Sequence, residues 1–148
     1  MTTKGVRGQG SGVSKRDRSV GKGRRIRAEA IRSFRDLIVW RKAIQFAKIA
    51  YDLTKRFPAD ERFGLTSQVR RAAVSVSSNI AEGHSRQGRE FTQFLSIARG
   101  SLAEVESQLL LAVELGYLQV GVLDEALNLA CEIRRMASAL SARLASNL

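Results

Sequence analysis

Hydrophobic residues recur every three or four positions from Phe34 to the end of the chain, a spacing that predicts amphipathic α-helices. Breaks divide this pattern into four segments, which are residues 36–56, 61–83, 88–115 and a last one that begins after Gly121. Pro58 bars continuation of the first helix, while Gly83 and Gly116 stand where the second and third should end. Because short connections force neighbouring helices to be antiparallel, the pattern predicts an all-α, up-down-up-down four-helix bundle.

Each predicted helix has one apolar stripe that should face the core of the bundle. The expected core residues are Leu37, Trp40, Ile44, Ala47, Tyr51 and Thr54 in the first helix; Leu65, Val69, Ala72, Val76 and Ile80 in the second; Phe91, Leu95, Ala98, Leu102, Val105, Leu109 and Ala112 in the third; and Leu123, Ala126, Ala130, Ile133, Ala137, Leu140 and Leu144 in the fourth.

The second helix contains ten consecutive residues without a charge, from Ala72 to Ala81. On a helical wheel, small or apolar residues also lie nearly opposite the core stripe, at Val74, Ser77, Ser78 and Ala81. A helix that lacks charges all round is typically buried all round. We therefore interpret these four residues as an interface with a second copy or a partner protein. The alternative is an exposed face that merely carries few charges.

Positive charge is concentrated near the N-terminus. Residues 1–33 hold ten Lys and Arg against two acidic residues, a net of +8 out of the formal +11 of the whole chain. This Gly/Ser/Arg-rich segment has no hydrophobic period, so we expect a disordered arm, followed by one bundle domain at residues 34–148. The arm would be an electrostatic tether to nucleic acid, or alternatively a solubilising tail or an over-extended gene start.

Basic residues within the bundle are the candidate ligand-binding groups. Pairs or single residues on the first three helices would sum to a positive belt in a ring of copies, and such a belt suits phosphate binding. These candidates for nucleic-acid binding are Arg41, Lys42, Arg70, Arg71, Arg86 and Arg89. The alternative is that they are solvated or pair with Glu82, Glu90 and Glu132. No aromatic interleaving is evident among them, so base stacking is not indicated.

Catalytic chemistry finds little support in the residue inventory. One histidine, His84, and one cysteine, Cys131, cannot form a zinc or di-iron site, and no phosphate-binding glycine motif is present. The sequence therefore predicts a protein that is not an enzyme and needs no cofactor or metal. No apolar run approaches a membrane span, and a lone cysteine favours a reducing compartment, so we expect a cytoplasmic protein.

Four stretches resemble one protein family: FRDLIVWRKA, YDLTKRFPADERFGLTSQVRRAAVSVSSNIAEG, REFTQFLSIARGSLAEVESQL and LGYL. They are similar to the four-helix-bundle family encoded by intervening sequences of bacterial 23S ribosomal RNA genes, continuously from Phe34 to Leu118 and more loosely beyond. The chain departs from the pattern at Ser77, where the family commonly has proline, and near Gly88, which leaves the N-cap of the third helix open between Ser85 and Gly88.

The resemblance implies a non-enzymatic bundle that assembles into a ring, as a homopentamer. The chain is also similar to the accessory protein of diversity-generating retroelements, a bundle pentamer that contacts a reverse transcriptase and nucleic acid. We therefore expect an oligomeric scaffold that binds RNA or DNA through charge. The alternative is a protein–protein adaptor, such as an accessory subunit for a reverse transcriptase.

Overall fold

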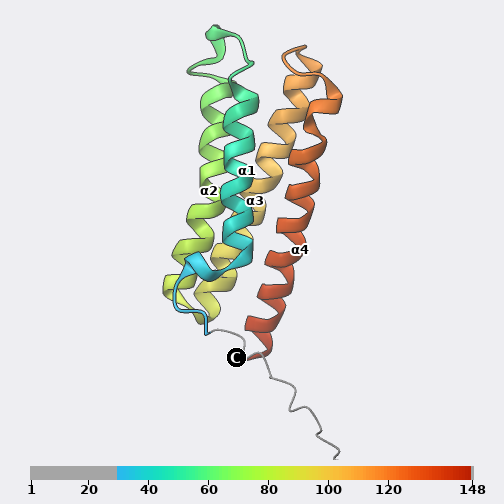
Figure 1. Cartoon of the computed structure of the whole chain (residues 1–148). Coiled ribbons are helices and arrows are strands. Elements are labelled where there is room, and N and C mark those ends of the chain that lie inside the picture. Colours follow the sequence, from blue (N-terminus) through green and yellow to red (C-terminus); the bar gives the residue numbers. More distant parts are fainter. Residues whose placement is uncertain (1–29, 148) are drawn as a thin grey trace, which may run out of the picture.

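Four long α-helices make up most of the described chain (Figure 1). The structure is a computed structural model and describes residues 30–147. The helices are α1 (Ile38–Thr54), α2 (Leu65–Arg86), α3 (Gly88–Glu114) and α4 (Asp124–Ser146). Short 3-10 helices, η1 (Phe34–Asp36), η2 (Ala59–Glu61) and η3 (Val120–Leu123), precede α1, α2 and α4, and no strand occurs between residues 30 and 147.

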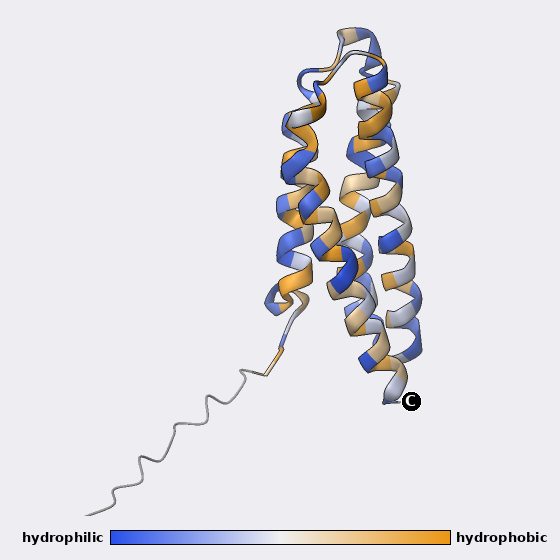
Figure 2. Ribbon diagram, turned by 90° about the vertical axis from the view of Figure 1, so that its right-hand side faces the viewer, coloured by the Kyte–Doolittle hydropathy of each residue, from blue (hydrophilic) through white to orange (hydrophobic). Residues whose placement is uncertain are grey.

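The helices pack in the order of the sequence. α2 lies between α1 and α3, and α4 contacts both α3 and α1. The loops 55–64 and 115–123 lie at one end of the bundle, at the top of Figure 1. The connection between α2 and α3 lies at the other end, together with the start of α1 and the end of α4. Hydrophobic and hydrophilic residues alternate along every helix, as Figure 2 shows, so each helix is amphipathic.

The predicted core of the last three helices is confirmed. Every predicted core residue of α2 and α3 is buried, and the same holds in α4 up to Ala137. Leu140 and Leu144 of α4 are partly buried and pack against this core. None of the helices between residues 30 and 147 is long and apolar enough to cross a membrane.

The predicted core stripe of α1 is confirmed only in part, and Trp40 and Ala47 are partly buried against the core. Leu37 and Thr54 are buried, but Ile44 and Tyr51 are 43% and 39% exposed. The residues that face the core instead are Val39, Ala43, Phe46, Ala50 and Leu53. Both sets repeat every three or four residues, and a shift of one position turns a helix by about 100°. The structure therefore puts Phe46 and two small alanines inside, and leaves Ile44 and Tyr51 on the surface.

α2 does not end at Gly83 as predicted. It continues to Arg86, and the left-handed residues Gln87 (φ 64°) and Gly88 (φ 56°) turn the chain into α3. Gly83 is buried inside the helix, where a Cβ atom would lie 2.7 Å from both Phe91 Cδ2 and Phe94 Cβ. Gly83 is therefore required for the close approach of α2 and α3, and not as a helix terminator.

Small polar residues extend this close α2–α3 contact. The hydroxyls of Ser75 and Ser101 lie 2.8 Å apart, and the Asn79 amide donates to both the carbonyl and the hydroxyl of Ser75. Asn79 thus finds the partners that a sheltered amide needs. Ser77 introduces no break, because α2 runs through it and its hydroxyl donates to the carbonyl of Val74.

The α3–α4 contact uses longer side chains. Arg134 of α4 pairs with Glu106 of α3, and Arg99 of α3 donates to the Ser138 hydroxyl at 3.2 Å. Within residues 30–147, buried polar atoms without a hydrogen-bond partner are Arg99 Nε, Gln108 Oε1 and Ser141 Oγ, which all lie on these two helices. Charged side chains therefore reach across the α3–α4 contact, whereas small uncharged side chains form the α2–α3 hydrogen bonds.

Candidate nucleic-acid interface

The six predicted basic residues do not form one cluster. Arg70 and Arg71 lie in the first half of α2, whereas Arg86 ends that helix. Arg86 is 15 positions after Arg71, which corresponds to about 22 Å of helix. Arg89 follows at the start of α3, and Arg41 and Lys42 lie in the first turns of α1, at the same end of the bundle as Arg86.

Carboxylates neutralise part of the basic group at that end. Lys42 pairs with Glu132 of α4 at 3.0 Å, and Arg86 pairs with Glu82 at 3.0 Å. Arg41 Nε donates to the backbone carbonyl of Arg35 at 2.8 Å. Lys42 and Arg86 therefore form ion pairs with glutamates of the same chain, which was the alternative to a role in nucleic-acid binding. Arg89 is exposed.

Arg70 and Arg71, by contrast, line an open groove of about 660 Å³ between α1 and the start of α2, which we call the α1–α2 groove. Its lining combines basic, aromatic, hydroxyl and small side chains: Tyr51, Arg62, Phe63, Thr66, Ser67, Arg70, Arg71, Val74 and Ser75. Three arginines thus surround the groove, and none of its lining residues is acidic. Such a concentration of positive charge attracts anions such as phosphates, and one carboxylate, that of Glu104, shares an adjoining hollow with Arg71.

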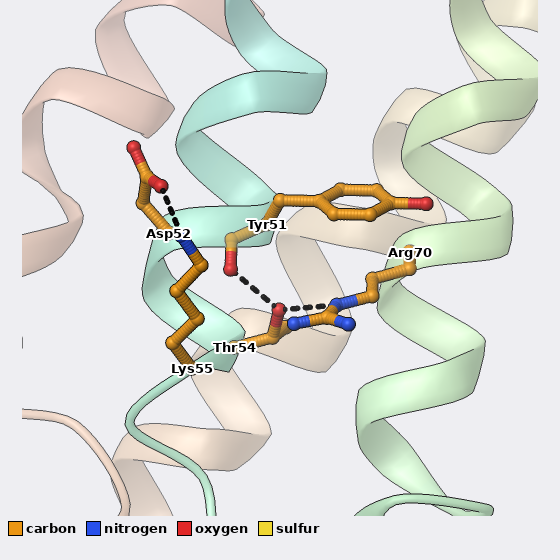
Figure 3. Close-up of polar contacts among 5 residues, drawn as sticks. All are labelled: Tyr51, Asp52, Thr54, Lys55 and Arg70. Carbon is orange, nitrogen blue, oxygen red and sulfur yellow. Dashed lines mark hydrogen bonds and ion pairs between the residues drawn. The ribbon is translucent and has the colours of Figure 1, made fainter.

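Arg70 is held in place by α1, as Figure 3 shows. Its Nε donates to Thr54 Oγ1 at 2.9 Å, and the Thr54 hydroxyl donates in turn to the Tyr51 carbonyl at 2.9 Å. The guanidinium lies 4.7 Å from the centre of the Tyr51 ring, a cation–π geometry. Only Nε of Arg70 donates to Thr54, so the two terminal nitrogens do not take part in that hydrogen bond. The contacts with Thr54 and Tyr51 hold the side chain in one position, which reduces the entropy that Arg70 would lose when it binds a ligand.

Arg62 and Phe63 form the rim of the groove. The Arg62 guanidinium lies 5.3 Å from the centre of the Phe63 ring, and Phe63 is 88% exposed. Both residues belong to the loop that leads into α2, and Glu61 anchors this loop. Glu61 Oε2 accepts a hydrogen bond from the Leu65 amide at 2.7 Å, while Oε1 accepts one from the Tyr117 hydroxyl at 3.1 Å.

Tyr117 links this loop to the loop that follows α3. Partial burial raises the pKa of its hydroxyl above the ordinary value, and the hydrogen bond to Glu61 adds to the shift. Its ring also packs against Phe57, with 5.6 Å between ring centres. The backbone that presents Arg62 and Phe63 is therefore fixed from two sides.

Sequence reasoning missed three of the five charged and aromatic residues that line the groove. It assigned Tyr51 to the core, gave no role to Arg62 and Phe63, and found no aromatic side chains among the basic ones. The available signal was the pair Arg62-Phe63 just before the first turn of α2, eight residues ahead of the pair Arg70-Arg71. Helix periodicity cannot indicate which way these two side chains point, because the pair precedes the helix.

The predicted interface on α2 is only partly at the surface. Val74 is 43% exposed, Ser78 is exposed and Ala81 is half-buried. Ser77 is only 6% exposed, so its assignment to an outer face was wrong. Because α1 and α3 flank α2 on both sides, the buried arc of α2 is wider than one stripe and includes Ser77. Much of the charge-free segment thus packs within the chain itself.

His84, which falls between the predicted helices 61–83 and 88–115, lies in the last turn of α2, with its ring edge-to-face to Phe91 at 5.8 Å. Cys131 is a half-buried free thiol on α4. Between residues 30 and 147, no three His, Cys, Asp or Glu side chains come together in a way that could hold a metal ion. The predicted arm, residues 1–33, lies almost entirely outside the described residues.

The fold and the groove together define a small, basic four-helix bundle with an arginine-lined surface. The chain belongs to the family of 23S rRNA-intervening sequence proteins, which it matches over residues 35–139. It is similar to a crystal structure of a protein of unknown function from the S23 ribosomal protein family of Bacteroides thetaiotaomicron, with a TM-score of 0.64 and 25% sequence identity. The match covers 70% of this chain and 98% of the other. No curated protein matches this chain.

Proposed function

We propose that this chain is a non-enzymatic, oligomeric scaffold of the cytoplasm that binds RNA or DNA through charge. The observation that carries the proposal is the α1–α2 groove, where Arg62, Arg70 and Arg71 face no acidic lining residue. Phosphates would replace counterions at these arginines, so the affinity should fall steeply as salt rises.

A salt-titrated binding assay tests this function. The full chain should bind labelled RNA and DNA at low salt, and Arg71→Gln should weaken binding and reduce the slope of log affinity against log salt by about one. Arg135→Gln on α4 is the matched control, because it removes one exposed arginine far from the groove. A comparison with residues 34–148 separates the contribution of the basic N-terminal segment. Absence of binding by both chains at low salt would refute the nucleic-acid part of the proposal.

We further propose that the bundle is antiparallel and assembles into a homopentameric ring. Ile44 of α1 and Val74 of α2 are each 43% exposed, and Ser78, one helical turn after Val74, is exposed and uncharged. The residues proposed to meet a second copy are Val74, Ser78 and Ala81, with Ile44 beside them. Because Val74 also lines the α1–α2 groove, assembly would bring grooves of several copies close to the ring contacts.

Light scattering tests the assembly. The unaltered chain should show a stable oligomeric mass, and Ser78→Glu or Ala81→Glu should yield a helical monomer, because each places an unpaired charge in the contact. Ser96→Glu, at an exposed position of α3, should leave the mass unchanged. An unaltered oligomer in the Ser78→Glu and Ala81→Glu variants would show that this surface is not the contact.

The second candidate function is a protein–protein adaptor, such as an accessory subunit for a reverse transcriptase. The exposed apolar side chains of Ile44 and Val74 favour it, since they would suit a different polypeptide equally well. A monomeric mass in light scattering would support the adaptor over the ring. A gene for a reverse transcriptase beside this one, rather than a surrounding rRNA operon, would support it further.

A further inference from the structure

Phe63 is the most exposed of the large hydrophobic side chains between residues 30 and 147, at 88% against 72% for Val120. It stands beside the α1–α2 groove, whose other aromatic residue, Tyr51, already has Arg70 over its ring. An aromatic ring in this position contributes almost nothing to the core. Its position next to three arginines points to a ligand that has both flat rings and negative charges.

We propose that the α1–α2 groove binds an unpaired stretch of nucleic acid, with a base stacked on Phe63 and the neighbouring phosphates at Arg62 and Arg71. The inference deepens the proposed function, on which it rests, by specifying single strands as the ligand. Every base has a π face that stacks on an aromatic ring without regard to sequence, and arginine adds a cation–π contribution.

The geometry suits such a stack. Arg62 lies at 5.3 Å from the Phe63 ring, yet the ring remains 88% exposed, so most of its surface is free for a base. The groove volume of about 660 Å³ falls within the range of about 300–1,000 Å³ that is usual for small-ligand sites. Arg71 is exposed on α2 and lines the same groove, where it can contact a phosphate of the strand.

The loop is also anchored well enough to hold a ring in position. Glu61 ties it to the first amide of α2 and to Tyr117 in the loop after α3. A side chain presented by a fixed backbone loses less entropy on binding than one on a free loop. In a duplex, by contrast, the bases are already stacked on one another and offer no free face, so a duplex can use only the arginines of this site.

The test compares four labelled probes of equal length by fluorescence anisotropy with the full chain: an oligouridylate, an oligothymidylate, an abasic strand and a duplex. Phe63→Ala should lower the affinity for both single strands by about 5- to 150-fold, the range that the loss of one aromatic–base stack produces. It should not change binding of the abasic strand or the duplex. Comparison of the oligouridylate with the oligothymidylate shows whether the groove prefers single-stranded RNA or single-stranded DNA.

Two further variants make the result specific. Phe63→Trp should restore the affinity for single strands, and its added indole emission should be quenched by the oligouridylate. The unaltered chain, which has Trp40 only, provides the baseline for this emission. Arg71→Gln should weaken binding of all four probes, because it removes a phosphate contact and not a base contact.

Stacking is overturned if Phe63→Ala leaves the affinity for single strands unchanged, or weakens the abasic strand equally. In either case the charge-driven function stands as long as Arg71→Gln weakens binding. A change of oligomeric mass in Phe63→Ala would instead assign Phe63 to a contact with a second copy and also overturn the proposal. If no probe binds the unaltered chain at low salt, the proposed function itself is refuted.

Discussion

α3 contacts α2 and α4 through two different kinds of surface. Against α2 it presents Ser101, Phe91 and Phe94, which meet Ser75 and Gly83 at van der Waals and hydrogen-bonding distance. Against α4 it presents Arg99 and Glu106, whose long side chains reach Ser138 and Arg134. Small residues thus allow the backbones of α2 and α3 to come close, whereas the α3–α4 contact bridges its gap with flexible charged groups.

The two contacts should differ in how strongly a substitution lowers the stability of the bundle. A close-packed contact has no space for an added methyl group, so its stability depends on volume. A contact made by partly exposed charged side chains depends on hydrogen bonds and screening, and single changes there have small effects. Substitutions in the two contacts should therefore differ in size as well as in their response to salt.

The largest effect is expected at Gly83. Gly83→Ala places a Cβ 2.7 Å from the Phe94 Cβ, so α3 must shift, and we expect a loss of about 1–3 kcal/mol in the free energy of unfolding. Gly100→Ala is the matched control, because an added Cβ in the middle of α3 meets nothing within 4 Å. It should stabilise by about 0.5–1 kcal/mol. Denaturant unfolding measures both. Equal effects of the two changes would contradict the close approach at Gly83.

At Ser101 we expect a smaller effect that again depends on volume. Ser101 is 8% exposed, and Ser101→Val adds bulk at the α2–α3 contact, for an expected loss of about 1–2 kcal/mol. Ser101→Ala removes only the hydroxyl, and Ser75 Oγ keeps its bond from Asn79, so the loss should stay under about 1 kcal/mol. If alanine is worse than valine in thermal unfolding, hydrogen bonding rather than packing dominates this contact.

In the α3–α4 contact, removal of one charge should matter less. Glu106→Gln keeps the shape of the side chain and should destabilise by about 0.5–1 kcal/mol, since both partners are partly exposed. A double-mutant cycle with Arg134→Gln isolates the coupling energy, which should shrink in high salt. A coupling energy that does not change with salt would indicate that the Arg134–Glu106 pair is less exposed to solvent than the 39% and 21% exposed fractions of these side chains.

The smallest effect is expected at Arg99. Its Nε is buried without a hydrogen-bond partner among residues 30–147, while one terminal nitrogen donates to Ser138. Arg99→Met removes the unpaired donor together with the single bond, so the unfolding free energy should change by less than about 0.5 kcal/mol. A loss of several times that size in denaturant unfolding would show that the guanidinium stabilises the α3–α4 contact.

Much of the bundle could be predicted from the sequence because its helices are long and strongly periodic. In α2, α3 and α4 only one apolar stripe fits the helical period, and the residues of that stripe pack in or against the core. In α1 two stripes satisfy the same period, so hydrophobicity alone could not choose Phe46 over Ile44. Gly83 has two common uses in helices, as a terminator and as a close-packing residue, and only the positions of Phe91 and Phe94 decide between them.

The candidate site was harder to predict because it depends on residues from two elements. Arg70 and Arg71 were identified from their charge, yet Tyr51 joins them only through the packing of α1 against α2. Arg62 and Phe63 lie in a loop, where no periodicity ranks one residue above another. The burial of Ser77 could not be predicted either, because it follows from the packing of α1 and α3 on both sides of α2.

The single-residue connection at Gln87 has a consequence for the order of folding. It joins α2 directly to α3, so Gly83 and Phe91 meet with little loss of chain entropy, whereas the Lys42–Glu132 pair joins residues 90 positions apart. Contacts that are close in sequence form early. In stopped-flow experiments Gly83→Ala should therefore slow refolding, whereas Glu132→Gln should chiefly accelerate unfolding, with α4 joining the other helices last.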